Sequence, residues 1–389
     1  MAGALAPHLE AIRAREYPRF PAAEMVRRRD ALAAELTRAG ADVVLVCGEQ
    51  RAGGAVGWLT GWPVTAEAVA VFQPPQPELL FVQYYNHVPL ARRIAACEAR
   101  WAGHSTVATV VEELDRRRAR RVGIVGPLAL GKYRALAAHY ELIDLNPAYT
   151  QLRLVKSAAE LDWVRIGAWL SDQAISALTA QLRSGIDERE LWRLAENAYV
   201  GRGGTTWIHY FGVTPMADPR VCVPAQYASS RRIAPGDVVF TEISAQFWDY
   251  PGQVLRSFTV EAEPTPLYRD LHAVAEAACE AILAVVRDGA PMAEIVDAAG
   301  VVEAAGFTTC DDLVHGFVGG YLPPVLGSRS RPAGPLPALR LAAGMTIVVQ
   351  PNVVTRDGRA GVQTGELVLV TGSGCERLHT APRGFARVG

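Results

Sequence analysis

The 389-residue sequence has no long block of one charge, no paired spacing of cysteines and no apolar run that approaches a membrane span. Lysine and arginine total 39 against 40 aspartates and glutamates, which makes nucleic acid or an anionic membrane surface a poor candidate for the main partner. The first ten residues have neither the charged n-region nor the apolar h-region of a secretory signal. We therefore expect a cytoplasmic protein that acts on a small molecule.

The six cysteines are scattered along the chain, a pattern that favours small apolar fillers over a disulfide framework or a metal site. A nucleophilic cysteine would need a nearby base and an electropositive setting. Cys310 lies five residues before His315 and is the one candidate for such a role.

Strand-like and helix-like stretches alternate between residues 16 and 146, which predicts an α/β layer architecture. Helical spacing covers residues 25–36, and short apolar runs predict strands at 42–47, 68–72, 79–82 and 120–125.

A second domain is expected to begin after Leu152, which gives domains of residues 1–152 and 153–389. Ser157 and Glu160 have the spacing of a capping box, which marks the start of a helix. Apolar residues at helical spacing follow it, and two further helices are predicted at 187–200 and 267–286. That apolar stripe comprises Leu161, Val164, Ala168, Ile175, Leu178 and Leu182.

Four segments carry the most specific pattern in the chain. Residues 236–245 and 253–260 predict a β-hairpin around the break at 249–252. The other three segments are 313–320, 344–351 and 361–371. In this order and spacing they resemble the pita-bread fold of methionine aminopeptidase, prolidase, aminopeptidase P and creatinase.

The resemblance implies an α/β protein whose C-terminal domain is α+β, of the creatinase and methionine aminopeptidase type. It also implies a smaller α/β creatinase-type N-terminal domain, whose signature resembles the Trp-Leu-Thr-Gly-Trp segment from Trp58 to Trp62. Members of the family usually form homodimers, so a homodimer is expected here.

The family binds two metal ions through Asp, Asp, His, Glu and Glu. These positions fall on Glu242, Gln253, His315, Gln350 and Gly365. Two divalent cations need several anionic oxygens, and this set offers one carboxylate and one imidazole. The resemblance with these substitutions predicts that the chain holds neither metal nor another cofactor.

Glu366 is the one neighbouring carboxylate that could replace the glutamate missing at Gly365. A shift of one residue along a strand turns a side chain to the other face, so Glu366 should point away from the cleft.

Creatinase shows that this fold can break a carbon-nitrogen bond without metal, through a histidine acid/base, glutamates that hold a guanidinium group and arginines that hold a carboxylate. The position of that histidine, twelve residues before Asp237, is Ala225 here. Hydrolysis of creatine itself is therefore not expected.

The remaining polar residues suggest a different site. His315 could move a proton near neutral pH, Glu242 could orient it, and the amides of Gln253 and Gln350 suit a neutral or anionic ligand. Arg256 is predicted to lie beside them. As alternatives, His315 caps a turn and Glu242 forms a structural ion pair with Arg256.

Further candidates lie outside these positions. His209 could replace the missing base and Tyr210 could form a pocket wall. Arg329 and Arg331 could bind a substrate carboxylate, or be solvated loop charges. Trp248, with Tyr250, either lines the pocket or packs beneath it.

Three hypotheses follow. The first is a metal-independent enzyme that hydrolyses or eliminates at a carbon-nitrogen or similar bond of a small carboxylate-bearing polar metabolite, with His315 as acid/base. The second is a catalytically silent protein that binds a peptide or metabolite. The third is a metallopeptidase of the Xaa-Pro type.

Overall fold

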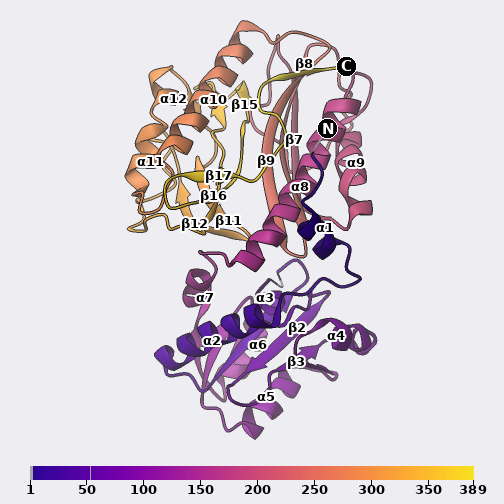
Figure 1. The fold of residues 1–389 in the computed structure, drawn as a ribbon, viewed down its shortest axis with the longest axis vertical. Helices are drawn as coiled ribbons and strands as arrows, with labels where there is room; N and C mark the ends of the chain where they lie inside the picture. The colour runs from indigo at the N-terminus through magenta and orange to yellow at the C-terminus, as the bar shows by residue number, and fades with distance from the viewer. Residues whose placement is uncertain (1–2, 53) are drawn as a thin grey trace. The chain divides into compact units, whose positions relative to one another are not determined.

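The computed structural model describes residues 3–52 and 54–389 (Figure 1). The chain divides into two compact units, one formed by Ala14–Arg153 and the other by Met1–Arg13 together with Leu154–Gly389. Among the helices of the described ranges, none combines the length and the hydropathy needed to cross a membrane.

The smaller unit is built on a six-stranded sheet with the strand order β4-β3-β2-β1-β5-β6. Its strands are β1 Val43–Glu49, β2 Glu67–Phe72, β3 Leu79–Val82, β4 Glu98–Trp101, β5 Arg121–Val125 and β6 Glu141–Asp144. β2 runs antiparallel to both of its neighbours, and the other pairs are parallel. The α/β architecture predicted for this part of the chain is confirmed.

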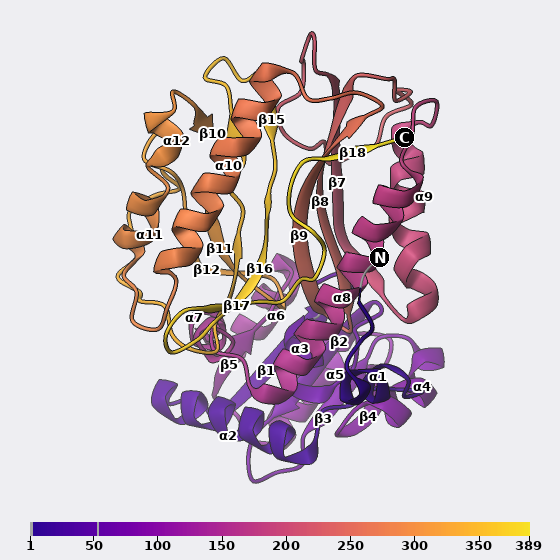
Figure 2. The same ribbon diagram turned by 45° about the horizontal axis from the view of Figure 1, so that its top comes forward.

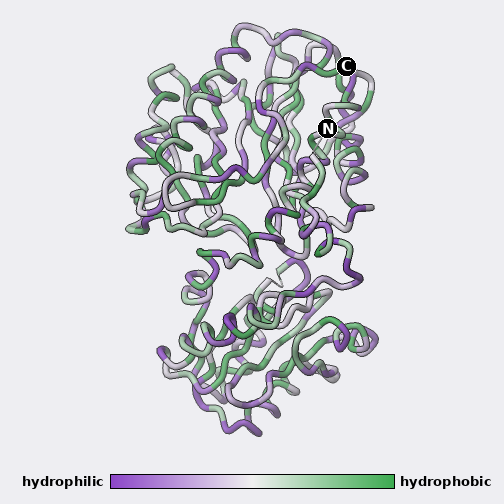
Figure 3. The backbone as a smooth tube through the Cα atoms, in the orientation of Figure 1, coloured by the Kyte–Doolittle hydropathy of each residue, from purple (hydrophilic) through white to green (hydrophobic). Residues whose placement is uncertain are grey.

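Helices flank this sheet. They are α2 Ala22–Ala39, α3 Gly54–Thr60, α4 Val88–Ile94, α5 Thr106–Arg116, α6 Leu130–Ala137 and α7 Asn146–Leu152, with a 3-10 turn at Tyr85–His87. α2 ends at Gly40, whose left-handed conformation lets its N–H bond the last carbonyls of the helix. Trp58 and Trp62 of the predicted signature are both buried. Figure 3 shows that hydrophobic stretches of the chain follow the central strands.

The larger unit contains a nine-stranded sheet with the main order β12-β11-β13-β16-β9-β8-β7, and a three-stranded sheet ordered β10-β14-β15. The long strands are β7 Thr205–Pro215, β8 Asp237–Phe247 and β9 Tyr250–Val260. The others are β10 Thr308–Thr309, β11 Val314–Phe317, β12 Tyr321–Leu326, β13 Thr346–Val349, β14 Val353–Val354, β15 Gly361–Val362, β16 Gly365–Val370, β17 Cys375–Arg377 and β18 Ala386–Val388.

The predicted hairpin is the pair β8 and β9, with longer strands than the sequence suggested. A two-residue turn of Trp248 and Asp249 joins them, and both residues have positive φ, at 48° and 67°. This turn geometry matches the twist of antiparallel strands, so pairing continues from Val238 to Phe247.

The helices of this unit are α1 Pro7–Arg13, α8 Ala158–Gln181, α9 Glu188–Tyr199, α10 Pro266–Val285, α11 Met292–Ala298 and α12 Val301–Ala304, with a 3-10 turn at Val200–Arg202. The capping box is present: Glu160 N–H donates to Ser157 Oγ, and Ser157 N–H donates to the Glu160 carboxylate. The predicted helices at 187–200 and 267–286 correspond to α9 and α10.

The central sheet has two distinct faces at β7, β8 and β9. We call the face that carries Glu242 the site face and the other one the opposite face. α8 and α9 pack on the opposite face, where the rings of Trp163 and Phe247 lie 5.2 Å apart. Figure 2 shows these two helices alongside the three long strands. Tyr250 packs there too, since its hydroxyl donates to Glu160 over 3.1 Å.

Candidate functional site

The five positions of the family's metal ligands meet on the site face. Glu242 pairs with Leu255 and Ser244 pairs with Gln253, so Glu242 and Gln253 are diagonal neighbours on one face. Leu255 in turn pairs with Gly365, which extends the same face onto β16.

Because side chains alternate along each strand, the site face also includes residues of β13 and β11. Glu366 pairs with Val349, so the adjacent Gln350 lies on the side of Gly365. His315 pairs with Val348, which also belongs to the site face. The predicted convergence of these five positions is therefore what the strand register produces.

Hydrogen bonds connect Gln253 to both Gln350 and Glu242. Gln253 Nε2 donates to Glu242 Oε1 and to Gln350 Oε1, each over 2.9 Å. Both donors of the Gln253 amide are thus used, and both glutamines are almost fully buried. At these former ligand positions the side chains bond one another instead of offering free carboxylates.

Gly365 leaves no room for a ligand. A Cβ atom there would lie 2.1 Å from the Val349 carbonyl oxygen, and φ is 146°, a conformation that side chains rarely adopt. The adjacent backbone at Val349 and Gln350 therefore leaves no space for a side chain at the position of the fifth ligand.

Glu366 points to the opposite face, as the alternation predicts. It bonds Arg256 over 2.9 Å and Arg383 over 3.2 Å, and it also bonds Arg377. Burial alone would raise the pKa of Glu366, but the arginines outweigh it and lower the pKa to about 2. Glu366 cannot stand in as a metal ligand.

These residues do not fit a two-metal centre. A catalytic metal needs about three protein ligands, and only Glu242 and His315 remain at the five positions. In residues 3–52 and 54–389, no group of three or more histidines, cysteines, aspartates and glutamates is arranged to hold a metal ion.

Glu242 is held in its neutral form. Burial is the main cause, followed by the charges of Asp311 and Asp312, and together they raise the pKa of Glu242 to about 8. The carboxyl group therefore carries a proton at neutral pH and can donate it.

His315 is shifted in the other direction. Burial lowers the pKa of His315 to about 4, so the ring is neutral at pH 7. Its Nδ1 lies 3.1 Å from the Gly316 carbonyl, which can only accept, so Nδ1 carries the proton and Nε2 is the unprotonated nitrogen. The side chain of Gln350 also forms a hydrogen bond with the imidazole. The ring of Tyr321 stacks on the imidazole at 4.2 Å.

Asp311 and Asp312, just before β11, were missed in the sequence. Their signal was an acidic pair four and three residues before His315. Asp312 N–H donates to Asp311 Oδ1 over 2.8 Å. Burial, together with the hydrogen bond and charge of Asp312, raises the pKa of Asp311 to about 6.

His209 is not part of this face, which corrects the prediction that it replaces the missing base. It pairs with Ile243, so it points to the opposite face, where it is fully buried. Its Nε2 lies 2.7 Å from the Tyr199 hydroxyl on α9. Tyr210, the next residue, lies directly opposite Glu242 on the site face.

Arg256 also lies on the opposite face, which corrects the prediction that it lies beside Glu242 and the two glutamines. It pairs with Thr241, and its ion-pair partner is Glu366 rather than Glu242. All five of its N–H donors are used within the protein. The other acceptors are the carbonyls of Leu255, Gly365, Ala381 and Pro382.

The last three predicted binding residues are dispersed. Arg329 is exposed and pairs with Asp297 over 2.6 Å. Arg331 Nη1 lies 3.6 Å from the sulfur of Cys310, next to the acidic pair. Trp248 is six residues from Glu242, which is about 20 Å along an extended strand. Of the three, only Arg331 lies close to the segment that carries the site.

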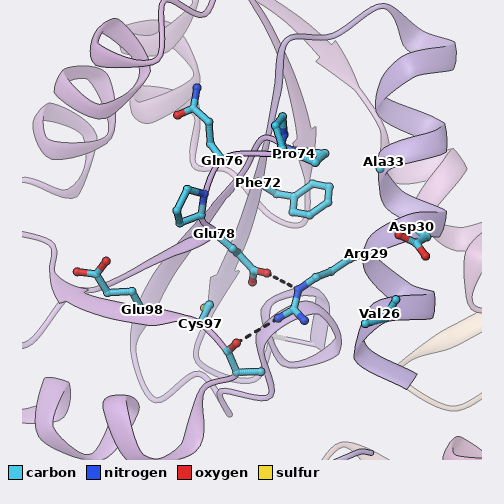
Figure 4. A pocket seen from close by; sticks show the side chains of 13 residues that line it. Val26, Arg29, Asp30, Ala33, Phe72, Pro74, Gln76, Glu78, Cys97 and Glu98 are labelled. Carbon is cyan, nitrogen blue, oxygen red and sulfur yellow. Dashed lines mark hydrogen bonds and ion pairs between the residues drawn. The ribbon is translucent and has the colours of Figure 1, made fainter. Parts of the chain in front are cut away.

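A separate cavity of about 440 Å³ lies in the smaller unit, between α2 and the segments before β3 and β4 (Figure 4). Arg29 reaches into it, where Nε donates to Glu78 over 2.8 Å and Nη2 donates to the Ala96 carbonyl over 3.2 Å. Burial raises the pKa of Glu78, although the Arg29 ion pair opposes this. None of the site-face residues described above lines this cavity.

Comparison with known proteins agrees with this fold. The chain is 24% identical to an uncharacterized hydrolase/peptidase, y4tL, of Sinorhizobium fredii, over 94% of this chain and 96% of the relative. It is 25% identical to the ectoine hydrolase of Halomonas elongata over 63% of each chain. The Xaa-Pro dipeptidase of Bacillus anthracis superposes with a TM-score of 0.80 at 19% identity, over 94% of this chain and all of that one.

The family model named Metallopeptidase family M24 matches residues 162–372, more than half of the chain. This range contains the hairpin, the acidic pair and all five former ligand positions. The chain belongs to metallopeptidase family M24, with the pita-bread fold.

Proposed function

We propose that this protein is a metal-independent hydrolase that breaks a carbon-nitrogen bond in a small polar molecule. One observation carries the proposal: the strand register brings two desolvated titratable groups, Glu242 and His315, to the same face of the sheet. Burial shifts their pKa values in opposite directions, to about 8 for Glu242 and about 4 for His315. Such a pair supplies a proton donor and a proton acceptor at the same pH.

In the proposed mechanism, His315 accepts a proton from a water molecule through Nε2 as the water oxygen attacks the substrate carbon. Glu242 donates its proton to the departing nitrogen as the carbon-nitrogen bond breaks. The excess proton then returns from His315 to Glu242 through solvent, which restores both groups. Elimination would use the same donor and acceptor without the attacking water.

The glutamines orient the acid in this scheme. Gln253 Nε2 donates to Glu242 Oε1, which favours the proton on Oε2, because the carbonyl oxygen of a carboxylic acid is the better acceptor. The Gln363 side chain also bonds this carboxyl group, and in the proposed mechanism the proton on Oε2 is the one that passes to the substrate. Gln350 fixes the Gln253 amide in turn.

Of the arginines predicted to bind a substrate carboxylate, Arg331 is the one that remains a candidate. Arg256 has no free donor, and Arg329 already pairs with Asp297. Arg331, beside Cys310, is the remaining group that could hold it.

The comparisons support the reaction class only. One relative is an ectoine hydrolase, by name a hydrolase of a small molecule, and the match covers 63% of its length. The Xaa-Pro metallopeptidase hypothesis is less well supported, because the former ligand positions hold amides and a glycine. A homodimer and a cytoplasmic location stay predictions.

The test is turnover of a panel of small amides and amidines by metal-stripped protein. Glu242→Gln and His315→Ala are each expected to lower kcat by roughly 10²–10⁴-fold, the usual contribution of a general acid or base. Glu263→Gln and His139→Ala are matched controls at exposed positions and should retain activity.

Unchanged turnover in both site variants would disprove the assigned roles. Absence of turnover on every substrate, with a specific ligand still bound, would favour the catalytically silent hypothesis instead.

A further inference from the structure

The acidic pair lies against the hydrogen-bonded core of the proposed site. The backbone N–H of Gln350 donates to the Leu313 carbonyl over 2.8 Å, and Gln350 Nε2 approaches the Asp312 carbonyl at 3.5 Å. Since Gln350 also accepts from Gln253, the segment at Asp312 is tied to Glu242 through two amides.

The carboxylates of this pair differ in exposure. Asp311 is accessible to solvent, although neighbouring atoms partly desolvate its carboxylate. Asp312 is buried; the Tyr321 side chain hydrogen-bonds its carboxylate, but its Oδ2 has no hydrogen-bond partner among the described residues. Gln363 is also buried and interacts with Glu242, and its Oε1 has no hydrogen-bond partner in the same described ranges. Buried acceptors without donors cost free energy, so a hydrogen-bond donor or a positive charge near these two oxygens would be favourable.

Aromatic rings border the same region. Tyr321 is 55% exposed although its ring stacks on His315 at 4.2 Å. Tyr210 lies directly opposite Glu242 on the neighbouring strand. Exposed tyrosine faces next to carboxylates attract cations both through the ring and through the charge.

We propose that Asp311, Asp312 and the ring of Tyr321 form a subsite for a cationic nitrogen of the substrate, such as a protonated amine, an amidinium or a guanidinium. The inference rests on the same site as the proposed function. It names the substrate class: a molecule with a positively charged nitrogen at the acidic pair, whose charges act on Glu242, while Arg331, which contacts Cys310, is available to an anionic group.

This assignment reverses the expectation that the site would prefer a neutral or anionic ligand. That expectation came from the loss of carboxylates at the former ligand positions. Asp311 and Asp312 restore negative charge a few residues away, and the charges that act on Glu242 are these two carboxylates.

The test is binding, measured by titration calorimetry on the full chain with four probes of similar size. They are butylammonium, methylguanidinium, neutral butyramide and anionic butyrate. The two cations should bind, and their affinity should fall with added salt because the attraction is electrostatic. Asp311→Asn and Tyr321→Leu should each weaken cation binding roughly tenfold.

Asp270→Asn, an exposed acid on α10, is the matched control and should leave the affinity unchanged. Asp311→Asn keeps an oxygen to accept the Asp312 N–H, so the variant should fold. A melting temperature confirms this for each variant.

Three outcomes would overturn the subsite: butyrate or butyramide binds as tightly as the cations, no probe binds at millimolar concentration, or cation binding survives both substitutions. Stoichiometric binding of Mn²⁺ alone that competes with the cations would overturn it too.

Binding and turnover separate the two proposals. Cation binding without hydrolysis of any substrate would keep the subsite and refute the hydrolase. Hydrolysis that depends on Glu242, without cation binding, would keep the hydrolase and refute the subsite.

Discussion

Replacing Glu242 with glutamine should abolish activity and at the same time stabilise the fold at alkaline pH. Burial, and then Asp311 and Asp312, raise the pKa of Glu242 from 4.5 to about 8 in the folded protein. The unfolded chain ionises this group near its ordinary pKa. The folded state therefore loses stability as the pH rises from about 4.5 to about 8, and the loss is complete above that range.

The size of the effect follows from the shift. Each pKa unit corresponds to about 1.4 kcal/mol, so the whole shift corresponds to at most about 5 kcal/mol. Glutamine cannot ionise, and its Oε1 can still accept the hydrogen bond that Gln253 Nε2 makes over 2.9 Å. The variant should match the wild type near pH 4.5 and gain on it steadily up to pH 8.

Urea unfolding at several pH values between 4.5 and 9 measures this difference. Glu263→Gln is the control, because Glu263 is exposed and pairs with Arg387 at the surface over 3.3 Å, so its effect should vary little with pH. A constant offset between wild type and Glu242→Gln, or a variant that is less stable at pH 9, would show that Glu242 is ionised in the folded protein. Glu242 could then not act as the proposed proton donor.

Three further predictions test the two faces of the sheet. Gly365→Glu restores the family's residue type. It should lower the melting temperature without creating metal binding, because its Cβ would lie 2.1 Å from the Val349 carbonyl. A folded variant with bound metal would contradict this prediction. His209→Phe should destabilise the fold by about 1–3 kcal/mol in urea, because it leaves the buried Tyr199 hydroxyl short of a partner, and kcat should be unchanged. Arg256→Met should destabilise by about 3–5 kcal/mol, since it removes a partner of the buried Glu366 carboxylate, and a selective effect on KM instead would return Arg256 to the binding site.

The sequence was sufficient for the fold and for the convergence of the former ligand positions. Hairpin spacing, the capping box and the order of four segments were all local signals, and each appears in the structure. Glu242 and Gln253 are eleven residues apart across a hairpin, and only the pita-bread arrangement brings them to one face with His315.

Side-chain direction was predicted less well, because it depends on strand register. Arg256 lies three residues after Gln253 on one strand, so alternation alone places it on the other face, and that signal was present in the sequence. His209 was harder to place, since its direction depends on pairing with Ile243, far away along the chain. The pKa shifts of Glu242 and Asp311 depend on burial and on contacts between separate strands, which no local pattern reveals.

Metal content is the most direct test of the account's central claim, that the former metal site now works through a proton donor and a proton acceptor. Protein purified without chelator should contain far less than one zinc, manganese, iron or cobalt ion per chain by mass spectrometry. Its turnover should survive EDTA and should not rise when these metals are added back. About one or two ions per chain, bound tightly and lost together with activity in Glu242→Gln and His315→Ala, would contradict it.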